Sequence, residues 1–316
     1  MTTLSNMIDE VSMNLSGYTL QQDRATYITA AVTTTTSPSS APTILTLASA
    51  DNLGKGVVEI DEELLWIDNF DRVGNTATIA PYGRGYLGTT AATHALDTKV
   101  TISPTFPRFA IKRAINDTIT AIGSSIFAAD TTTITSNAAV AAFRLPSGTS
   151  TTLNIRSILA VAYQALGASK EWIPIRTFRF DGNANTTAFT SGQTISIYDV
   201  IPSGRTIQIA YSTYPVAFSD LATTALTNAQ VFATVTKLPD SCKDLVILGA
   251  TYRLLSNLDP ARASMISPQA DEVDAKRPYG SSQSITKQIY ALFNQRLNEE
   301  IKNQQDRYPI RIHYSL

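Results

Sequence analysis

Hydrophobic residues recur at helical spacing in four stretches of the chain. Near the N-terminus, the spacing over Leu4–Leu15 predicts a short helix that ends at Gly17. In residues 104–130, isoleucines lie on one face of a predicted helix, and Pro107 stands at its start, where a missing N–H costs little. A third helix is expected from Pro239. The last one carries the most regular stripe, formed by Ile285, Ile289, Leu292, Phe293, Leu297 and Ile301.

The stretches between these helices contain short alternating runs bounded by turn residues, which predict β-strands. Residues 56–103 indicate a small barrel or sandwich. Residues 131–236 indicate a β-sandwich, with turn signals such as Asp181-Gly182. The expected strands cover 43–47, 56–60, 64–67, 76–79, 99–102, 132–135, 141–145, 155–165, 173–180, 194–197 and 206–212.

The order of these elements predicts an α+β fold. We expect the N-terminal, central and C-terminal helices to form one bundle into which two β domains are inserted. The predicted segments are an N-terminal bundle helix (1–18), a small β-barrel or sandwich module (19–103), a central bundle helix (104–130), an inserted β-sandwich (131–237), C-terminal bundle helices (238–305) and an extended tail (306–316).

Charge is scarce and balanced in this chain of 316 residues. Charged residues make up 16%, against about 25% in typical globular proteins, and the net charge is −1. This balance argues against a protein that binds nucleic acid by neutralising many phosphates. Abundant Thr and Ser instead predict β-structure with a neutral polar surface, typical either of packed subunits or of an extracellular-type β domain.

The residue types that carry most catalytic and metal chemistry are rare. Two histidines, His94 and His313, and the single Cys242 exclude His/Cys zinc sites and an internal disulfide. We therefore expect no enzyme, no cofactor and no metal. The N-terminus has no signal-peptide pattern, no apolar run is long enough to span a membrane, and one cysteine fits synthesis in a reducing cytoplasm.

Several local motifs can be interpreted either as purely structural features or as catalytic or ligand-binding sites. Gly83-Arg-Gly-Tyr-Leu-Gly88 has the glycine spacing of a dinucleotide site but lacks a following helix, so we interpret it as a tight loop whose glycines relieve positive φ angles. Asp61, Glu62, Glu63 and Asp68 near Trp66 suggest sugar hydrolysis or calcium binding, but we predict a solvated turn. We also predict that Asp271–Arg277 is a solvated connection, that His94 is a locally hydrogen-bonded loop residue, and that Cys242 is structural.

The C-terminal segment alternates in character. Tyr308, Ile310, Ile312 and Tyr314 lie on one face of an extended segment, with Arg311 and His313 on the other. Such a strand can pair with its own sheet, add to a neighbouring subunit or dock in a partner's groove.

Two stretches resemble a module of tailed-bacteriophage virion proteins. The first is Val58-Glu-Ile-Asp-Glu-Glu-Leu-Leu-Trp-Ile67, and the second is Gly83-Arg-Gly-Tyr-Leu-Gly-Thr-Thr-Ala-Ala-Thr-His94, with the pattern Arg-Gly-x-x-Gly-Thr-x-Ala-x-x-His. Such modules usually have a Gly where this chain has Leu96-Asp97. The arrangement of helices is similar to the bundle of the phage head-to-tail connector (adaptor) family.

This resemblance implies a structural virion protein of the neck or tail, made in the cytoplasm of the bacterial host. It implies a homo-oligomeric, dodecameric ring beneath the portal protein, in contact with tail or fibre proteins and with dsDNA that passes without sequence recognition. It also implies that the C-terminal segment docks on the portal. The docking residues would be Arg307, Tyr308, Ile310, Arg311, Ile312, His313 and Tyr314.

Other functions remain open at this point. A tail component, either a tubular or nozzle protein or a fibre or baseplate subunit, is the main alternative, although a fibre would more often show sequence repeats. Carbohydrate binding by the 131–236 sandwich is another, because Trp172 and several tyrosines could stack on sugars. An enzyme is the third, and no acid, base and nucleophile set converges for it.

Overall fold

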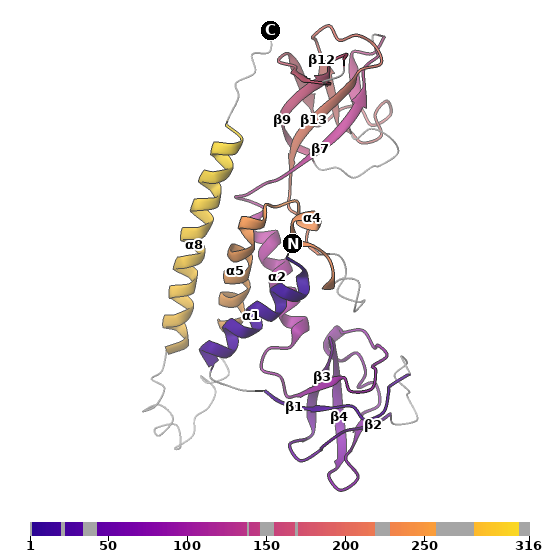
Figure 1. Ribbon diagram of the computed structural model, residues 1–316, viewed down its shortest axis with the longest axis vertical. Coiled ribbons are helices and arrows are strands. Elements are labelled where there is room, and N and C mark those ends of the chain that lie inside the picture. The colour runs from indigo at the N-terminus through magenta and orange to yellow at the C-terminus, as the bar shows by residue number, and fades with distance from the viewer. Residues whose placement is uncertain are drawn as a thin grey trace. The chain divides into compact units, whose positions relative to one another are not determined.

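The fold is built mostly from β-strands. The computed structural model describes residues 2–19, 23–33, 43–137, 139–145, 155–167, 170–218, 228–256 and 281–309. These residues form thirteen strands in three sheets and five α-helices (Figure 1). The predicted fold class, a helical bundle carrying two inserted β domains, is therefore wrong. The physical reason is that the strands bury hydrophobic cores of their own, so the sheets and not the helices dominate the architecture.

The elements have the following bounds. The helices are α1 (Leu4–Thr19), α2 (Arg108–Ile122), α4 (Phe232–Thr236), α5 (Lys243–Leu255) and α8 (Ser281–Arg307), with 3-10 turns η1 (Tyr86–Gly88) and η2 (Asp240–Cys242). The strands are β1 (Arg24–Tyr27), β2 (Ile44–Thr46), β3 (Gly56–Ile60), β4 (Glu63–Asp71), β5 (Thr76–Ile79), β6 (Lys99–Ile102), β7 (Ala128–Thr135), β8 (Ala142–Arg144), β9 (Ile155–Gln164), β10 (Trp172–Pro174), β11 (Phe178–Asp181), β12 (Thr194–Ile197) and β13 (Thr206–Thr213).

The chain divides into two compact units. Unit 1 contains Met1–Thr118, Ala217–Val235 and Asp240–Arg296, and unit 2 contains Ile119–Val216, Thr236–Pro239 and Leu297–Leu316. This division does not decide the predicted segment boundaries, which stay a prediction.

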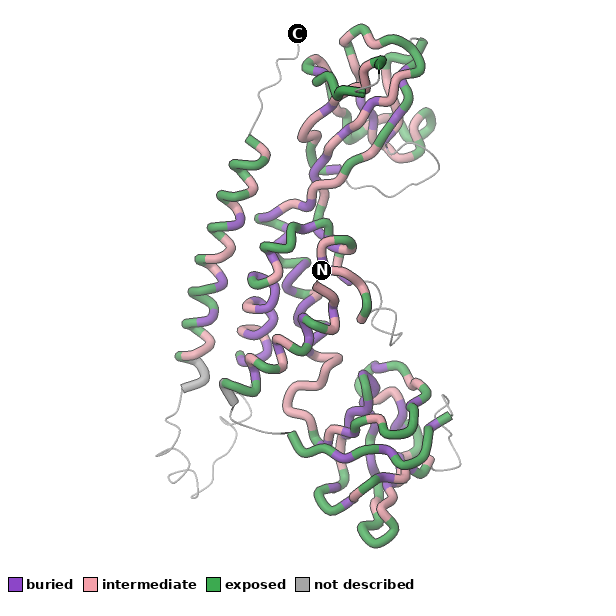
Figure 2. Tube along the Cα trace, viewed as in Figure 1, coloured by how far each residue is buried: buried purple, intermediate pink, exposed green. Residues whose placement is uncertain are grey.

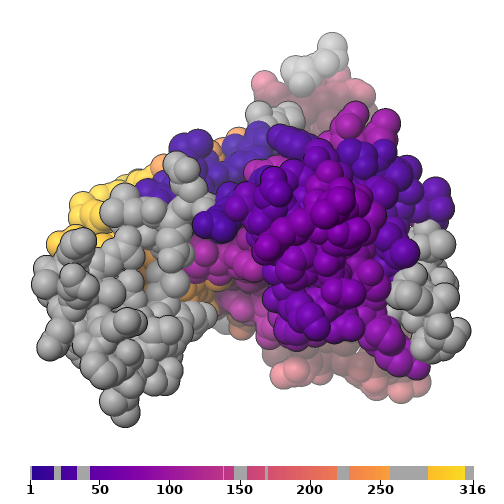
Figure 3. Space-filling model, turned by 90° about the horizontal axis from the view of Figure 1, so that it is seen from below, coloured from indigo at the N-terminus to yellow at the C-terminus, as the bar shows by residue number. Residues whose placement is uncertain are grey.

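The first sheet lies in unit 1 and has six antiparallel strands in the order β1-β6-β3-β4-β5-β2. An isolated bridge between Ile28 and Leu47 joins the segments that follow its two outer strands. Inward-facing residues such as Val58, Ile60, Leu65 and Ile67 form one buried core, and Figure 2 shows buried positions running through these strands. In Figure 3 the residues of this sheet, in indigo and purple, form one rounded surface.

The helices of unit 1 pack through small and aliphatic residues. The predicted N-terminal helix is confirmed as α1, which contacts α5 and buries Leu4, Ile8 and Val11 completely. Gly249 of α5 lies so close to α2 that a Cβ there would overlap the Thr118 side chain, and Phe293 of α8 lies 3.0 Å from the same position. Glycine is therefore required for this close helix packing.

Two sheets face one core in unit 2. A four-stranded sheet has the order β10-β9-β13-β7 and a three-stranded sheet the order β11-β12-β8. Val161 and Ile209 from the first sheet and Ile195 from the second belong to the same hydrophobic cluster. The single strand predicted over 173–180 is wrong, because the chain forms β10 and β11 in different sheets. Pro174 ends β10, as expected for a residue without an N–H to donate.

The remaining helix predictions agree with the structure except at their ends. Helix α2 stops at Ile122, before Ile126, which is nevertheless buried beside the start of β7. The C-terminal stripe lies on α8, which continues to Arg307 and so extends into the segment predicted to be an extended tail.

Candidate functional site

The tight β3–β4 turn is a junction of buried charges. Four acidic side chains at this turn contact two different parts of unit 1. Glu59 and Glu62 contact residues of α2. Asp61 and Glu63 contact the loop that carries Arg84 and His94. Glu62 is 7% exposed and Glu63 only 1%. The predicted solvated turn is therefore wrong for these two residues, because each carboxylate has basic or N–H partners that compensate for burial.

Glu63 is the centre of the first group, which we call the Glu63 cluster (Asp61, Glu63, Arg84 and His94). Its two oxygens accept hydrogen bonds from Arg84 Nε and Nη2 at 2.6 and 2.9 Å. The backbone N–H groups of Gly85 and Ala92 donate to the same carboxylate at 3.0 and 2.9 Å. The loop that contains both backbone groups is thereby fixed to the start of β4.

His94 bridges two carboxylates within this cluster. Its Nε2 lies 2.8 Å from Glu63 Oε2 and its Nδ1 lies 2.9 Å from Asp61 Oδ2. The imidazole is buried, and its partners lie more than thirty residues earlier in the sequence, so the prediction of a locally hydrogen-bonded loop residue is wrong. The contacts join two segments that are distant in sequence.

Opposing effects set the pKa values in the Glu63 cluster. Burial alone would raise the pKa of Glu63, but the hydrogen bonds from Arg84, His94 and the two backbone N–H groups outweigh it and lower the pKa to about 2. Burial would lower the pKa of His94, but its hydrogen bonds and charge interactions with Asp61 and Glu63 raise it. The cluster therefore favours a charged carboxylate at Glu63 and a protonated imidazole beside it.

Glycines shape the loop above the cluster. Gly85 and Gly88 have φ angles of 62° and 85°, which confirms the interpretation of the glycine motif as a tight loop with positive φ angles. Gly83 is required for space, since a Cβ there would lie 2.8 Å from the carbonyl oxygens of Ala80 and Trp66. Thr89 accepts a hydrogen bond from the N–H of Leu64 at 3.1 Å. The residues of the glycine motif thus hold the loop against β4.

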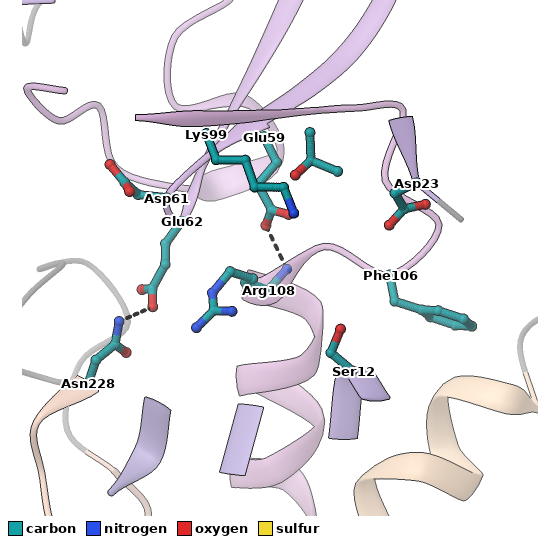
Figure 4. Close-up of a pocket in the computed structure, with 10 residues that line it drawn as sticks. Ser12, Asp23, Glu59, Asp61, Glu62, Lys99, Phe106, Arg108 and Asn228 are labelled. Carbon is teal, nitrogen blue, oxygen red and sulfur yellow. Dashed lines mark hydrogen bonds between the residues drawn. The ribbon is translucent and has the colours of Figure 1, made fainter. Parts of the chain in front are cut away.

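The second group of charged residues lines a pocket of about 370 Å³ between β3 and the start of α2, which we call the sheet–helix pocket (Figure 4). Its lining includes Asp23, Glu59, Glu62, Arg108 and Asn228. Glu59 accepts a hydrogen bond from the backbone N–H of Arg108, the first residue of α2, at 2.6 Å. Lys112, whose side chain is fully buried, forms a 2.7 Å ion pair with Glu62. Asn228 donates to the other oxygen of Glu62. These contacts attach the six-stranded sheet to α2 within unit 1.

Burial dominates the ionisation of Glu59. It raises the pKa to about 7, against an ordinary value of 4.5, although the Arg108 N–H and the Arg108 charge act in the opposite direction. Asp23 and Glu62 add repulsion that raises the pKa further. Glu59 is thus the group that changes charge near neutral pH at the junction of sheet and helix.

The predicted docking residues are described only at the start of the C-terminal segment. Arg307 ends α8, and its guanidinium carbon lies 5.6 Å from the centre of the Tyr308 ring. Tyr308 packs on Phe127 with 5.8 Å between ring centres. Gln304 accepts a hydrogen bond from the N–H of Phe127 at 3.1 Å and donates one to its carbonyl at 2.5 Å. Ile310, Arg311, Ile312, His313 and Tyr314 lie outside the described residues.

The sequence contained signals for some residues that the predictions missed. Gln304 lies three residues after Ile301, at the next position of the stripe that also contains Leu297, and this spacing was a signal that its side chain faces the protein. Lys112 follows Ile111 on α2 and gave no comparable signal, because a lysine beside an apolar position is usually solvated. Only the fold shows that Glu62 lies opposite it.

The cysteine, the remaining acidic residues and the expected absence of a metal site complete the comparison with the sequence predictions. Cys242 is buried at the start of α5. Asp68 is exposed and forms a surface ion pair with Lys55, 3.9 Å apart, as expected for a solvated acid. Asp271–Arg277 lies outside the described residues. Where the structure describes the chain, no group of three or more His, Cys, Asp or Glu side chains could hold a metal ion.

Within the described ranges, no helix is both long and apolar enough to cross a bilayer.

Comparison with known families assigns the chain. A family model described as SU10 adaptor protein matches residues 87–313, which is more than half of the sequence. The chain belongs to this family and is therefore a phage structural adaptor protein and a component of the virion. This result confirms the phage adaptor part of the resemblance. A search of curated proteins gave no match.

Proposed function

We propose that this adaptor protein assembles as a dodecameric ring in the neck of the virion, beneath the portal, where it joins the capsid to the tail and leaves a central passage for dsDNA. The family match over residues 87–313 carries this proposal. The match includes α2, both sheets of unit 2, α5, α8 and the C-terminal segment as far as His313. The low net charge suits a passage through which DNA moves without being held.

Within this assembly, the C-terminal segment is the portal-docking element. Helix α8 is 27 residues long and ends at Arg307, and Gln304 and Tyr308 fix that end to Phe127. A segment that starts from a fixed point loses less conformational freedom on binding than one that starts from a free end. Its alternating Ile310, Ile312 and Tyr314 suit strand addition or insertion into a groove of the portal.

The role proposed here is mechanical and not enzymatic. The charged residues of the Glu63 cluster and of the sheet–helix pocket hold structural elements to one another: Glu63 binds Arg84 and two backbone N–H groups, and Glu62 binds Lys112. The oxygens of these carboxylates accept hydrogen bonds that hold the fold together, and this is the role we assign to them.

Mass photometry of the protein with a purified cognate portal ring tests the proposal. Twelve copies of a 34.1 kDa chain would add roughly 410 kDa to the portal. A chain that ends at Pro309 should lose this gain, whereas Asp68→Asn, a change at an exposed carboxylate, should keep it. Absence of association at micromolar concentration would contradict an adaptor that docks on the portal and would favour a tubular, nozzle, fibre or baseplate component of the tail.

A further inference from the structure

Three side chains at the sheet–helix pocket bring an amine, a carboxylate and an amide together. Lys112 of α2 lies 2.7 Å from Glu62 Oε2. Asn228, which precedes α4, donates from Nδ2 to Glu62 Oε1 (Figure 4). Both oxygens belong to one carboxylate, so the amine and the amide are held against the same small group. Lys112 and Asn228 are far apart in the sequence, and the fold of unit 1 makes them neighbours.

Burial gives this arrangement a chemistry that a surface ion pair lacks. The Lys112 side chain is fully buried, and that of Glu62 is 7% exposed. Two charges held away from water carry a large desolvation cost, which disappears when one proton passes from the ammonium to the carboxylate. That transfer leaves a neutral amine, which is a nucleophile, beside a neutral carboxyl group.

The amide of Asn228 is the group that this amine can attack. Glu62 holds its nitrogen, whereas its Oδ1 is buried and, in the part of the chain that the structure describes, has no hydrogen-bond partner. A buried carbonyl oxygen without a donor is rare, because the missing bond costs free energy. Here it also leaves the carbonyl unanchored, so that Cγ is free to turn toward Lys112 Nζ.

We propose that Lys112 and Asn228 join in an intramolecular isopeptide bond once the chain has folded. The lone pair of Nζ attacks Cγ of Asn228, and an electron pair of the carbonyl moves to Oδ1. The lysine nitrogen loses two protons in all, of which Glu62 passes one to Nδ2 and keeps the other. The carbonyl then re-forms, the Cγ–Nδ2 bond breaks, and ammonia leaves with that electron pair. One amide replaces another, so the reaction needs no oxidant and no co-reactant.

The surroundings suit each part of this reaction. The fold already holds the amine and the amide on one carboxylate, which removes most of the entropic cost of bringing them together. Glu62 and Asn228 both line the sheet–helix pocket, which gives the ammonia a way out. Glu62 thus has a second role, in proton transfer, besides its role in holding the sheet to α2.

The position of the bond in the chain gives it a mechanical consequence. Lys112 lies shortly before the chain enters unit 2 at Ile119, and Asn228 lies in the stretch Ala217–Val235 by which the chain returns to unit 1. The bond therefore closes a covalent loop around the whole of Ile119–Val216. Pulling α2 away from the returning stretch would then require breaking a covalent bond. Formation of the bond does not rest on the proposed function.

Intact-mass spectrometry of the denatured full-length protein tests the proposal. The natural chain should weigh about 17 Da less than its sequence requires, since one ammonia is lost for each bond formed. A tryptic digest should contain one branched peptide that joins Lys112 to Asn228. Lys112→Arg, Asn228→Ala and Glu62→Gln should each have the full mass of their sequence. Lys99→Arg changes an exposed lysine that lines the same pocket, and as the matched control it should keep the loss.

The measurement on the natural chain decides the matter even where a variant fails to fold. Full sequence mass in a natural chain that unfolds cooperatively would overturn the proposal. A loss of ammonia that persists in Lys112→Arg, or that gives no branched peptide, would assign the loss to cyclisation of an asparagine and would overturn it too. A branched peptide in Glu62→Gln would refute the proton transfer through Glu62. None of these results involves the portal, so the outcome is separable from that of mass photometry.

Discussion

The Glu63 carboxylate and the Arg84 guanidinium form a two-point ion pair in which both side chains are inaccessible to solvent. The two residues are 21 positions apart, so their pairing closes a long loop onto β4. Trp66 of β4 and Tyr86 of the loop then lie 5.3 Å apart, ring centre to ring centre. The motif that resembles a phage virion module is thus a device for fixing one loop, and its arginine, glycines and histidine have structural roles.

Replacing Arg84 by Met should destabilise unit 1 severely. The substitution leaves the Glu63 charge buried without its main partner, and breaking a buried pair in this way costs about 3–5 kcal/mol. Urea unfolding followed by the fluorescence of Trp66 and Trp172 measures the change. Lys55→Met, which breaks the exposed pair with Asp68, should cost at most about 1 kcal/mol. Similar losses in both variants would contradict the importance of the buried pair.

Local patterns in the sequence predicted most elements but not which of them dominate. The isoleucine stripe of α2 and the alternating residues of β3–β6 and β13 depend on nearest neighbours, and those elements were found. The balance between bundle and sheets depends on which elements share a core, and strand pairing over long separations sets this. The pairing of β13 with both β7 and β9 is one such case.

In the candidate site too, features set by neighbouring residues were predicted, whereas contacts between residues distant in sequence were not. The positive φ angles of Gly85 and Gly88 were predicted because a turn imposes them locally. The burial of Glu62 and Glu63 was not predicted, because acidic residues in a turn are normally solvated and their partners, Lys112 and Arg84, lie far away in the sequence. A buried charge can be recognised only when its counter-charge is placed beside it.

Stability of unit 1 should fall as pH rises through neutrality, and Glu59→Gln should remove part of this fall. The pKa of Glu59 is about 7 in the folded chain against an ordinary value of 4.5, so its contribution is fully present below pH 4.5 and is lost as pH rises through 7. The loss between pH 5 and 8 is about 2.5 kcal/mol.

Denaturant unfolding at pH 5, 6, 7 and 8 measures this slope. His94 also has a raised pKa and so loses stability in the same direction at higher pH, which is why the difference between the natural chain and Glu59→Gln is the informative quantity. Asp68→Asn provides an exposed control. A difference that does not change with pH would show that Glu59 is not the titrating group.

Close packing at Gly249 gives a prediction for the helices. Gly249→Ala forces Thr118 of α2 and Phe293 of α8 to move, and overpacking of this kind costs about 1–3 kcal/mol despite the better helix propensity of alanine. Gly54→Ala is the matched control, since nothing lies within 4 Å of its Cβ position. Thermal unfolding of the two variants should show a lower midpoint for Gly249→Ala alone.

Gln304 should control both the stability of unit 2 and the docking of the C-terminal segment. In Gln304→Ala the N–H and the carbonyl of Phe127 lose their side-chain partner, which costs about 1–3 kcal/mol where they stay shielded from water. The point from which the segment leaves α8 is then no longer fixed, so association with the portal ring in mass photometry should weaken as well. Gln305→Ala changes an exposed glutamine at the next position and should alter neither property. Loss of portal association in both variants would mean that the end of α8 binds through its exposed face, and that the contact with Phe127 does not position the docking segment.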